Sequence, residues 1–144
     1  MNRSVMLDSG PLGKIAHPRP NPDISAWMLR LLKADVAIMI PEIADYEVRR
    51  NLLLSGLTKS VSRLDQLRQV LIYQPITTET MLRAAELWAN ARKRGKPTAD
   101  PKELDGDVIL ASRAMEADAV VMTENIGHLS LFVEAVRWHE YSLA

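Results

Sequence analysis

Three acidic residues stand where the sequence pattern calls for an apolar or neutral side chain. Asp8 directly follows the apolar run at residues 5–7, and Glu47 falls within the apolar sector of a predicted helix. Asp107 lies one step off the apolar stripe of a later predicted helix. Two unit charges about 4 Å apart repel by roughly 4 kcal/mol at an effective dielectric of about 20. If folding gathers these acids, then protonation or a divalent cation must offset their repulsion.

The remaining composition favours a hard cation. The sequence has no cysteine, and its three histidines show no metal-ligand spacing, which argues against zinc. Mg²⁺ or Mn²⁺, held by carboxylate oxygens and retained waters, is therefore the expected ion. Such an ion orients a phosphate, activates a water and stabilises charge on a departing oxygen.

Further polar residues follow the predicted strands. Ser9 comes directly after Asp8, and residues 123–125 (Thr-Glu-Asn) follow the apolar run at 119–122. In an open parallel sheet, ligands bind outside the carboxyl ends of the strands, so these groups are expected at one edge. An ordinary turn is the alternative interpretation of Asp8 taken alone.

Two of the helical acids also have structural alternatives. Glu47 can pair with Arg50 at i+3. Asp105 can share a site with Asp107 only if Asp105 itself caps the helix, since a helix that begins at Pro101 points the two acids about 160° apart. Glu42 lies in a first helical turn, where it complements the macrodipole, and it is assigned no catalytic role.

Strand-like and helix-like segments alternate along the chain, which predicts an α/β protein with a mostly parallel sheet covered by helices on both faces. A proline-rich loop is expected at residues 10–22. The predicted strands are residues 5–7, 36–40 and 119–122, with a weaker candidate at 72–76 and an edge strand within 135–141, and the predicted helices are 23–33, 42–55, 59–71, 78–94 and 101–117.

Length and charge set the broad class. A chain of 144 residues has the length of one domain, and 18 basic against 18 acidic residues give no net pull towards nucleic acid or an anionic membrane. Any such binding must use a local patch. The N-terminal apolar run is too short for a signal peptide or a membrane span, so a cytoplasmic protein without a membrane partner is expected.

Four segments, in order, resemble the PIN-domain nucleases, and VapC-like toxins of type II toxin–antitoxin systems in particular. The segments are LDS (7–9), IPEIADYEVRRNLL (40–53), LDGDVILASRA (104–114) and VVMTENIGHLSLF (120–132). The resemblance implies a single PIN-like domain over residues 1–144, a three-layer α/β/α sandwich with a mostly parallel five-stranded sheet. It also implies a Mg²⁺- or Mn²⁺-dependent ribonuclease that cleaves RNA, pairs with a small antitoxin protein and forms a homodimer.

The resemblance also implies roles for individual residues. Asp8, Glu47 and Asp107 match the catalytic acids that bind the metal. Many family members carry a further Asp in the last loop, so the fourth ligand stays open between Asp105, Glu124 and Asn125. The supporting or substrate-binding positions are Ser9, Asp105, Thr123, Asn125 and Arg50.

Contacts to RNA phosphates require lysine and arginine near the site. The candidates are Arg49, Arg50, Lys59, Arg63 and Arg68, with a second patch at residues 92–94 and Lys96. Basic residues at the end of a helix also favour its dipole, so the second patch has a purely structural alternative.

Two other functions remain open at this point. A receiver-like Mg²⁺-binding phosphoacceptor module also gathers acids at strand ends, but it needs an acidic pair after the first strand and an Asp after a central strand. This chain offers Asp8 alone and Glu42 after its second strand. A catalytically inactive PIN-like module that binds nucleic acid is the second alternative.

Overall fold

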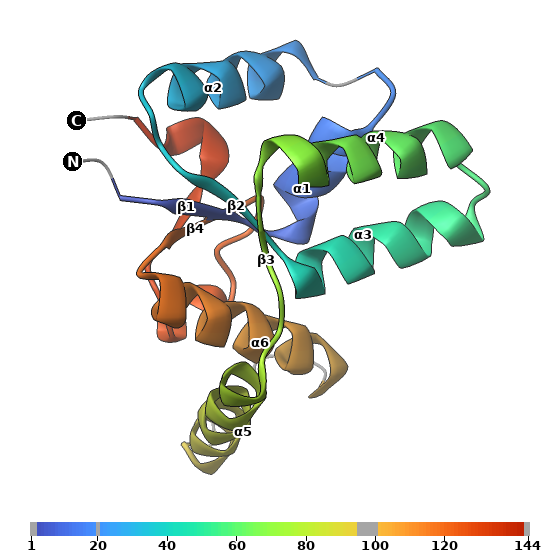
Figure 1. Cartoon of the computed structure of the whole chain (residues 1–144). Helices are drawn as coiled ribbons and strands as arrows, with labels where there is room; N and C mark the ends of the chain where they lie inside the picture. The colour runs from blue at the N-terminus through green and yellow to red at the C-terminus, as the bar shows by residue number, and fades with distance from the viewer. Residues whose placement is uncertain (1–2, 20, 95–100, 143–144) are drawn as a thin grey trace.

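A five-stranded parallel sheet forms the centre of the molecule (Figure 1). The computed structural model describes residues 3–19, 21–94 and 101–142. The strand order is β3-β2-β1-β4-β5, and all pairings are parallel. The strands are β1 (Val5–Leu7), β2 (Ile38–Pro41), β3 (Ile72–Gln74), β4 (Val120–Thr123) and β5 (Ala135–Arg137). All five predicted strands are confirmed, although most are shorter than predicted.

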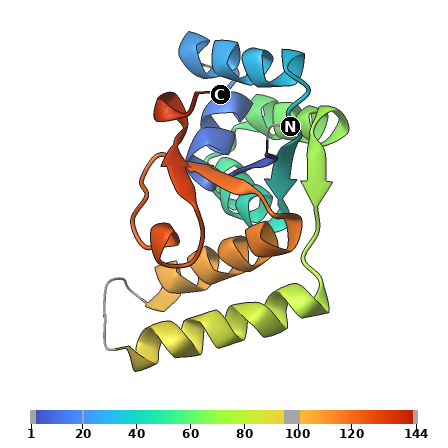
Figure 2. The ribbon, with the colours of Figure 1, turned by 90° about the vertical axis from the view of Figure 1, so that its left-hand side faces the viewer.

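Helices cover both faces of this sheet, so the predicted three-layer α/β/α sandwich is confirmed. Helices α1 to α4 lie on one face and α6 on the other, while α5 packs on the outer side of α6 (Figures 1 and 2). The helices are α1 (Ser9–Ala16), α2 (Pro22–Lys33), α3 (Glu42–Leu54), α4 (Thr58–Val70), α5 (Thr78–Lys93) and α6 (Pro101–Ala117), followed by short 3₁₀ turns at Leu129–Leu131 and Trp138–Glu140.

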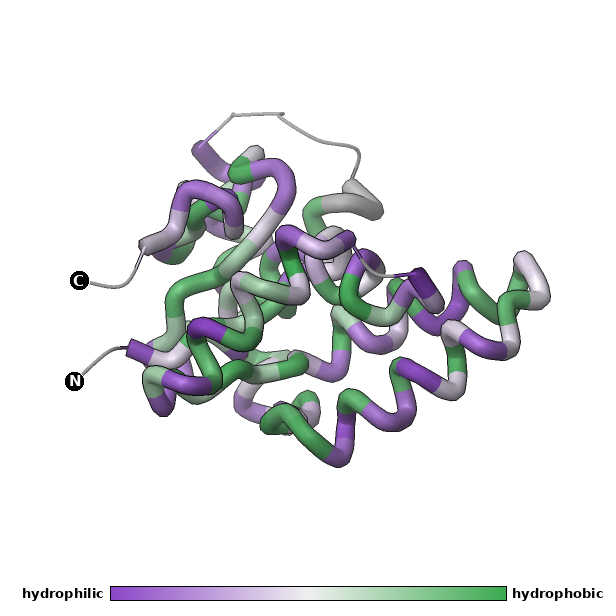
Figure 3. Tube along the Cα trace, turned by 90° about the horizontal axis from the view of Figure 1, so that it is seen from above, coloured by the Kyte–Doolittle hydropathy of each residue, from purple (hydrophilic) through white to green (hydrophobic). Residues whose placement is uncertain are grey.

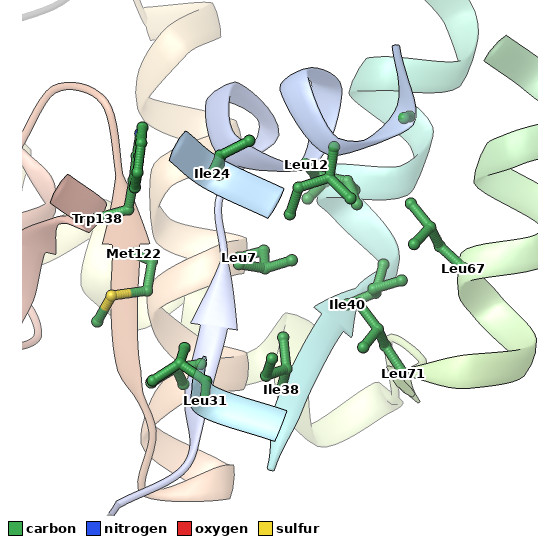
Figure 4. Packing of buried hydrophobic residues seen from close by; sticks show 14 of the residues in the cluster. Leu7, Leu12, Ile24, Leu31, Ile38, Ile40, Leu67, Leu71, Met122 and Trp138 are labelled. Atoms are coloured by element: carbon green, nitrogen blue, oxygen red, sulfur yellow. The ribbon is translucent and has the colours of Figure 1, made fainter. Parts of the chain in front are cut away.

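The central strand β1 is apolar because both of its faces are buried. Leu7 packs with residues of α1 and α4, such as Leu12 and Leu67, on one side of the sheet (Figure 4). Met6 points to the other side, where it packs with Leu110 of α6. The helices that cover the sheet alternate between hydrophobic and hydrophilic residues along the trace, as amphipathic helices do (Figure 3). Within the described residues, none of the helices has the length and apolar character needed to cross a membrane.

The expectation of a loop at residues 10–22 is wrong for its first half, which forms α1. Pro11 lies in the first helical turn, where its missing N–H costs nothing, and Pro18 follows the C-cap. Leu12 and Ile15 are fully buried against the sheet. The prolines therefore bracket this helix, and its two glycines are tolerated because packing outweighs propensity.

The connection from β1 to α1 sets the position of the site. The backbone N–H of Asp8 donates to the carbonyl of Met122 at 2.9 Å, which ties the end of β1 to the end of β4. The chain leaves β1 towards one neighbour, β2, and reaches the other neighbour, β4, only later. The carboxyl ends of β1 and β4 therefore form the crevice in which open α/β sheets bind ligands.

The burial of α1 can be tested by truncating its central leucine. Leu12→Ala is expected to lower the free energy of unfolding by about 2–5 kcal/mol, because it leaves a cavity against the sheet. Leu54→Ala is the matched control, since Leu54 is 87% exposed at the end of α3, and it is expected to change stability by about 0.5 kcal/mol or less. Urea denaturation followed by circular dichroism measures both. Equal effects of the two substitutions would contradict the packing of α1 on the sheet.

Candidate active site

A cavity of about 260 Å³ lies at the carboxyl ends of β1 and β4. It is open to solvent and is lined by four separate parts of the chain, namely the start of α1, the middle of α3, the first half of α6 and the loop after β4. Its lining residues are Asp8, Ser9, Glu47, Gly106, Asp107, Asn125, Ile126, Gly127, His128 and Leu129. Folding thus places Asp8, Glu47 and Asp107 in one cavity, together with Ser9 and Asn125.

The carboxylate of Asp8 is held by hydrogen bonds to both of its oxygens. As the N-cap of α1, Asp8 accepts a hydrogen bond at Oδ1 from the backbone N–H of Ser9, at 2.7 Å. Its Oδ2 accepts one from the hydroxyl of Thr123, at 2.8 Å. The hydroxyl of Thr123 in turn accepts from the backbone N–H of Asn125, at 3.2 Å. Thr123 is buried beneath the cavity, so it orients Asp8 and the following loop.

The carboxylate of Glu47 is where the three acids influence one another most clearly. Burial raises the pKa of Glu47, and the negative charges of Asp8 and Asp107 raise it further. The positive charge of Arg50 lowers this pKa, but the net shift is upward. Pairing with Arg50, the structural alternative for Glu47, therefore does not outweigh burial and the acidic neighbours. The guanidinium of Arg50, which is exposed, stacks over the ring of Tyr46 at 5.1 Å.

Gly106 lets Glu47 approach α6 closely. A Cβ at position 106 would lie 3.0 Å from Oε2 of Glu47, so a side chain there would push the carboxylate away. The sequence analysis did not single out Gly106. Its sequence position did indicate a special role, because a glycine inside a helix lowers helix stability by about 1 kcal/mol relative to alanine and often allows a close packing contact.

Asp105 does not join the other acids. Helix α6 begins at Pro101, which selects the alternative in which Asp105 and Asp107 point apart. Asp105 instead borders an apolar hollow between α5 and α6, beside Trp88 and Val108. Its predicted supporting role in the site is therefore not supported by its position.

Glu124 is also directed away from the cavity. One of its carboxylate oxygens, Oε1, accepts from Nζ of Lys14 at 2.9 Å and from Nε1 of Trp138 at 2.8 Å. Its side chain lies over Gly10, where an added Cβ would come within 2.5 Å of Cγ of Glu124. Of the three candidates for a fourth ligand, only Asn125 lines the cavity.

The loop after β4 adds a residue that the sequence analysis missed. His128 is half-buried and lines the cavity with its neighbours Ile126 and Leu129. Gly127 has a positive φ of +43°, and its N–H donates to Oδ1 of Asn125 at 3.1 Å, which shapes this turn. The spacing of the histidines gave no signal for His128, because the loop conformation alone brings it to the site.

The donor set of the cavity suits a hard divalent cation. Asp8, Glu47 and Asp107 offer carboxylate oxygens, Asn125 offers an amide, and the charges of the acids raise the pKa of Glu47. Within the described residues, no three His, Cys, Asp or Glu side chains are already arranged to hold a metal ion. The acids share a cavity, and side-chain rotation within it would be needed for them to share an ion.

Several predicted RNA-binding cations also make structural contacts. Arg49 pairs with Asp45 and Asp65, and these partners raise its pKa. Nε of Arg63 donates to the carbonyl of Ile15 at 2.8 Å. The guanidinium of Arg68 stacks over the ring of Tyr73, and that of Arg92 stacks over the ring of Trp88. Lys96 lies outside the described residues.

Comparison with known proteins supports the fold. No family model and no curated protein matches the chain. Among solved structures, FitAcB from Neisseria gonorrhoeae is similar with a TM-score of 0.73 and 23% identity, covering 95% of this chain and 99% of that one. VapBC2 from Rickettsia felis, bound to a promoter DNA fragment, gives a TM-score of 0.74 at 18% identity, covering 92% and 96%. VapBC-1 from nontypeable Haemophilus influenzae gives 0.69 at 16%, covering 94% and 98%. The chain has a PIN-like α/β/α fold.

The raised pKa of Glu47 predicts a specific dependence of stability on pH. The folded protein binds the Glu47 proton more tightly than the unfolded chain, whose pKa is near 4.5. In EDTA, stability is therefore expected to fall as the pH rises from about 4.5 through the folded-state pKa. Glu47→Gln should remove this loss. The free energy of unfolding of the variant should therefore exceed that of wild type at pH 7, and the difference between the two proteins should be smaller at pH 4.

Urea denaturation between pH 4 and pH 8 measures this difference. Glu86→Gln, on the exposed surface of α5, is the matched control and should leave the pH profile unchanged. A wild-type profile that Glu47→Gln leaves unaltered would show that burial and the acidic neighbours do not raise the pKa of Glu47 in the folded protein.

Proposed function

We propose that this protein is a metal-dependent endoribonuclease and acts as the toxin of a toxin–antitoxin pair. The observation that carries the proposal is the convergence of Asp8, Glu47 and Asp107 on one solvent-open cavity at the carboxyl ends of β1 and β4. The negative charges of Asp8 and Asp107 raise the pKa of Glu47, so ionising all three acids lowers the stability of the folded protein. A bound cation, with RNA phosphate as substrate, gives this arrangement a function.

Asp8 and Asp107 would hold Mg²⁺ or Mn²⁺, and Glu47 would bind through water or a second ion. When bound, such an ion supplies an activated water and charge stabilisation for phosphodiester hydrolysis. Asp8 is already oriented for this task by the N–H of Ser9 and the hydroxyl of Thr123. These two hydrogen bonds fix the direction of the Asp8 oxygens before any ligand binds.

The other cavity residues would act on the substrate. The amide oxygen of Asn125 is engaged by the N–H of Gly127, so its NH₂ group is the part that can donate to a phosphate oxygen. His128 lines the same cavity and can donate a hydrogen bond to a phosphate oxygen of a bound substrate. Glu47, with its raised pKa, can take up a proton from a cavity water more readily than an ordinary carboxylate.

The toxin assignment is supported by the structural similarity to chains of the VapBC and FitAB toxin–antitoxin complexes over nearly their whole length. By that similarity, the partner would be a small antitoxin protein, and the toxin would form a homodimer. The acidic cavity favours the toxin over the antitoxin for this chain, because a metal-dependent hydrolase needs carboxylates grouped in a solvent-open cavity.

The receiver-like alternative fits the structure less well. A phosphoacceptor needs an available carboxylate after a central strand. Asp8 follows the central strand β1, but both of its oxygens already accept hydrogen bonds. Glu42 is the acid that follows β2. Its two oxygens accept from the hydroxyl of Tyr73, at 3.0 Å, and from the N–H of Ile76, at 2.9 Å. Glu42 therefore anchors the end of β3, as expected of a structural residue.

Metal-dependent cleavage is the direct test of the enzyme. Wild type is expected to cut single-stranded RNA with Mg²⁺ or Mn²⁺ and to stop in EDTA. Asp8→Asn and Asp107→Asn should abolish cleavage, and Thr123→Val should slow it by about 10- to 100-fold by freeing Asp8. Asp105→Asn is the matched control on the same helix and should cut normally. Cleavage that is indifferent to EDTA, or unharmed in both Asp variants, would contradict the metal-nuclease proposal.

The toxin role has a separate test in cells. Induced expression of wild type is expected to arrest growth, and expression of Asp8→Asn is expected to be harmless at the same protein level. Co-expression of a small protein encoded beside this gene should restore growth. Harmless expression of an active wild-type nuclease in the absence of that partner would contradict the toxin role while leaving the chemistry intact.

A further inference from the structure

A second hollow lies beside the acidic cavity, along α1. Its volume is about 440 Å³, and it is lined by Gly10, Gly13, Lys14, His17, Arg19 and Asn21. None of these described lining residues is acidic, and Lys14 and Arg19 carry positive charge at neutral pH. This hollow is called the basic groove below.

The basic groove begins where the acidic cavity ends. Ser9 lines the acidic cavity, and the next residue, Gly10, lines the groove. Gly10, Gly13, Lys14 and His17 follow the i, i+3, i+4, i+7 spacing of one helical face. At a rise of about 1.5 Å per residue, this face extends about 10 Å along α1. A polymer that enters the acidic cavity can therefore continue over this stripe.

The cations of the groove are not needed to cap α1. Basic residues near a helix end often satisfy its last carbonyls. Here the carbonyl of Gly13 accepts from the N–H of His17 at 3.1 Å, and the carbonyl of Ile15 accepts from Nε of Arg63 at 2.8 Å. Because these carbonyls are satisfied by other groups, helix capping does not account for Lys14 and Arg19.

His17 can add a donor to the same surface. Its Nδ1 lies 3.1 Å from the backbone N and 3.2 Å from the carbonyl O of Arg19. When Nδ1 accepts from this N–H, Nε2 carries the ring proton and can donate to a phosphate oxygen. His17 and Arg19 are both exposed, so a ligand in the groove can reach them.

Lys14 is partly neutralised before a ligand binds. Its Nζ pairs with Glu124 at 2.9 Å, and its side chain remains 43% exposed. An anion in the groove therefore competes with Glu124 for Lys14. Glu124 also accepts from Nε1 of Trp138, so it keeps one partner when Lys14 turns to the ligand.

We propose that the basic groove binds the phosphate backbone of the single-stranded RNA substrate on one side of the cleavage site. The identity of the ligand rests on the proposed function, because a nucleic acid that is cut in the acidic cavity must leave it along the surface. Consecutive residues, Ser9 and Gly10, line the cavity and the groove, and Lys14 and Arg19 supply positive charge in the groove. A repeating phosphate chain can span both hollows, and phosphate contacts dominate the affinity of proteins for nucleic acid.

The test is binding of a labelled single-stranded oligoribonucleotide in EDTA, followed by fluorescence anisotropy at several salt concentrations, with intact RNA verified on a gel. Lys14→Gln and Arg19→Gln are each expected to weaken binding several-fold. Each should also make the slope of log K against log salt shallower by about 0.7 for one lost phosphate contact. Lys33→Gln and Arg83→Gln, which change exposed cations of α2 and α5 that do not line the groove, are the matched controls and should leave both quantities unchanged.

Glu124→Gln gives a prediction of opposite sign. The glutamine can still accept from Trp138, but it no longer neutralises Lys14, so RNA should bind more tightly than to wild type. Damage to the fold would weaken binding, so a gain separates the charge effect from a structural one. The double variant Lys14→Gln, Glu124→Gln should lose this gain.

Three results would overturn the proposal. The first is a salt slope that neither Lys14→Gln nor Arg19→Gln changes, and the second is an equal loss in the Lys33 and Arg83 controls. The third is equally tight binding of polyglutamate with the same sensitivity to Lys14→Gln, which would assign the groove to an acidic protein segment. RNA binding that depends on the groove without metal-dependent cleavage would support the groove and contradict the nuclease.

Discussion

The mutual repulsion of Asp8, Glu47 and Asp107 is the constraint around which the site is built. The three acids come from the end of β1, from α3 and from α6, so the fold itself brings them together. Burial and two negative neighbours raise the pKa of Glu47, so this carboxyl gives up its proton less readily than an exposed one. Clusters of like charges that shift pKa values occur mainly at functional sites. The positive charge of a bound divalent cation would offset the repulsion between these acids.

The residues around the cavity fix the positions of its acidic side chains. Thr123 and the N–H of Ser9 fix the oxygens of Asp8, and Gly106 leaves room for Glu47. Glu124 is turned over Gly10 towards Lys14 and Trp138, which keeps a fourth negative charge out of the cavity. The same side chain links the loop after β4 to α1 through its ion pair with Lys14.

The strand and helix pattern, and the three inward acids, were readable from the sequence because they depend on local periodicity and on the rule for parallel strand ends. Asp8 follows a strand, while Glu47 and Asp107 interrupt apolar helix faces. The rest depends on contacts between distant segments. Helix α1 forms despite its prolines because Leu12 and Ile15 are buried by other elements. The directions of Asp105 and Glu124 are set by where α6 starts and by Trp138, and His128 reaches the site through a loop.

Titration of isotope-labelled protein with Mn²⁺, followed by paramagnetic broadening of backbone amide signals in NMR spectra, locates a bound cation directly. A cation held by the three carboxylates predicts early broadening centred on the amides of Ser9, Glu47 and Asp107, with Mg²⁺ in excess reversing it. Asp8→Asn should shift this broadening to higher Mn²⁺ concentration. Broadening that is absent from these amides, or centred on Asp105 or another acidic surface, would contradict a metal site in this cavity.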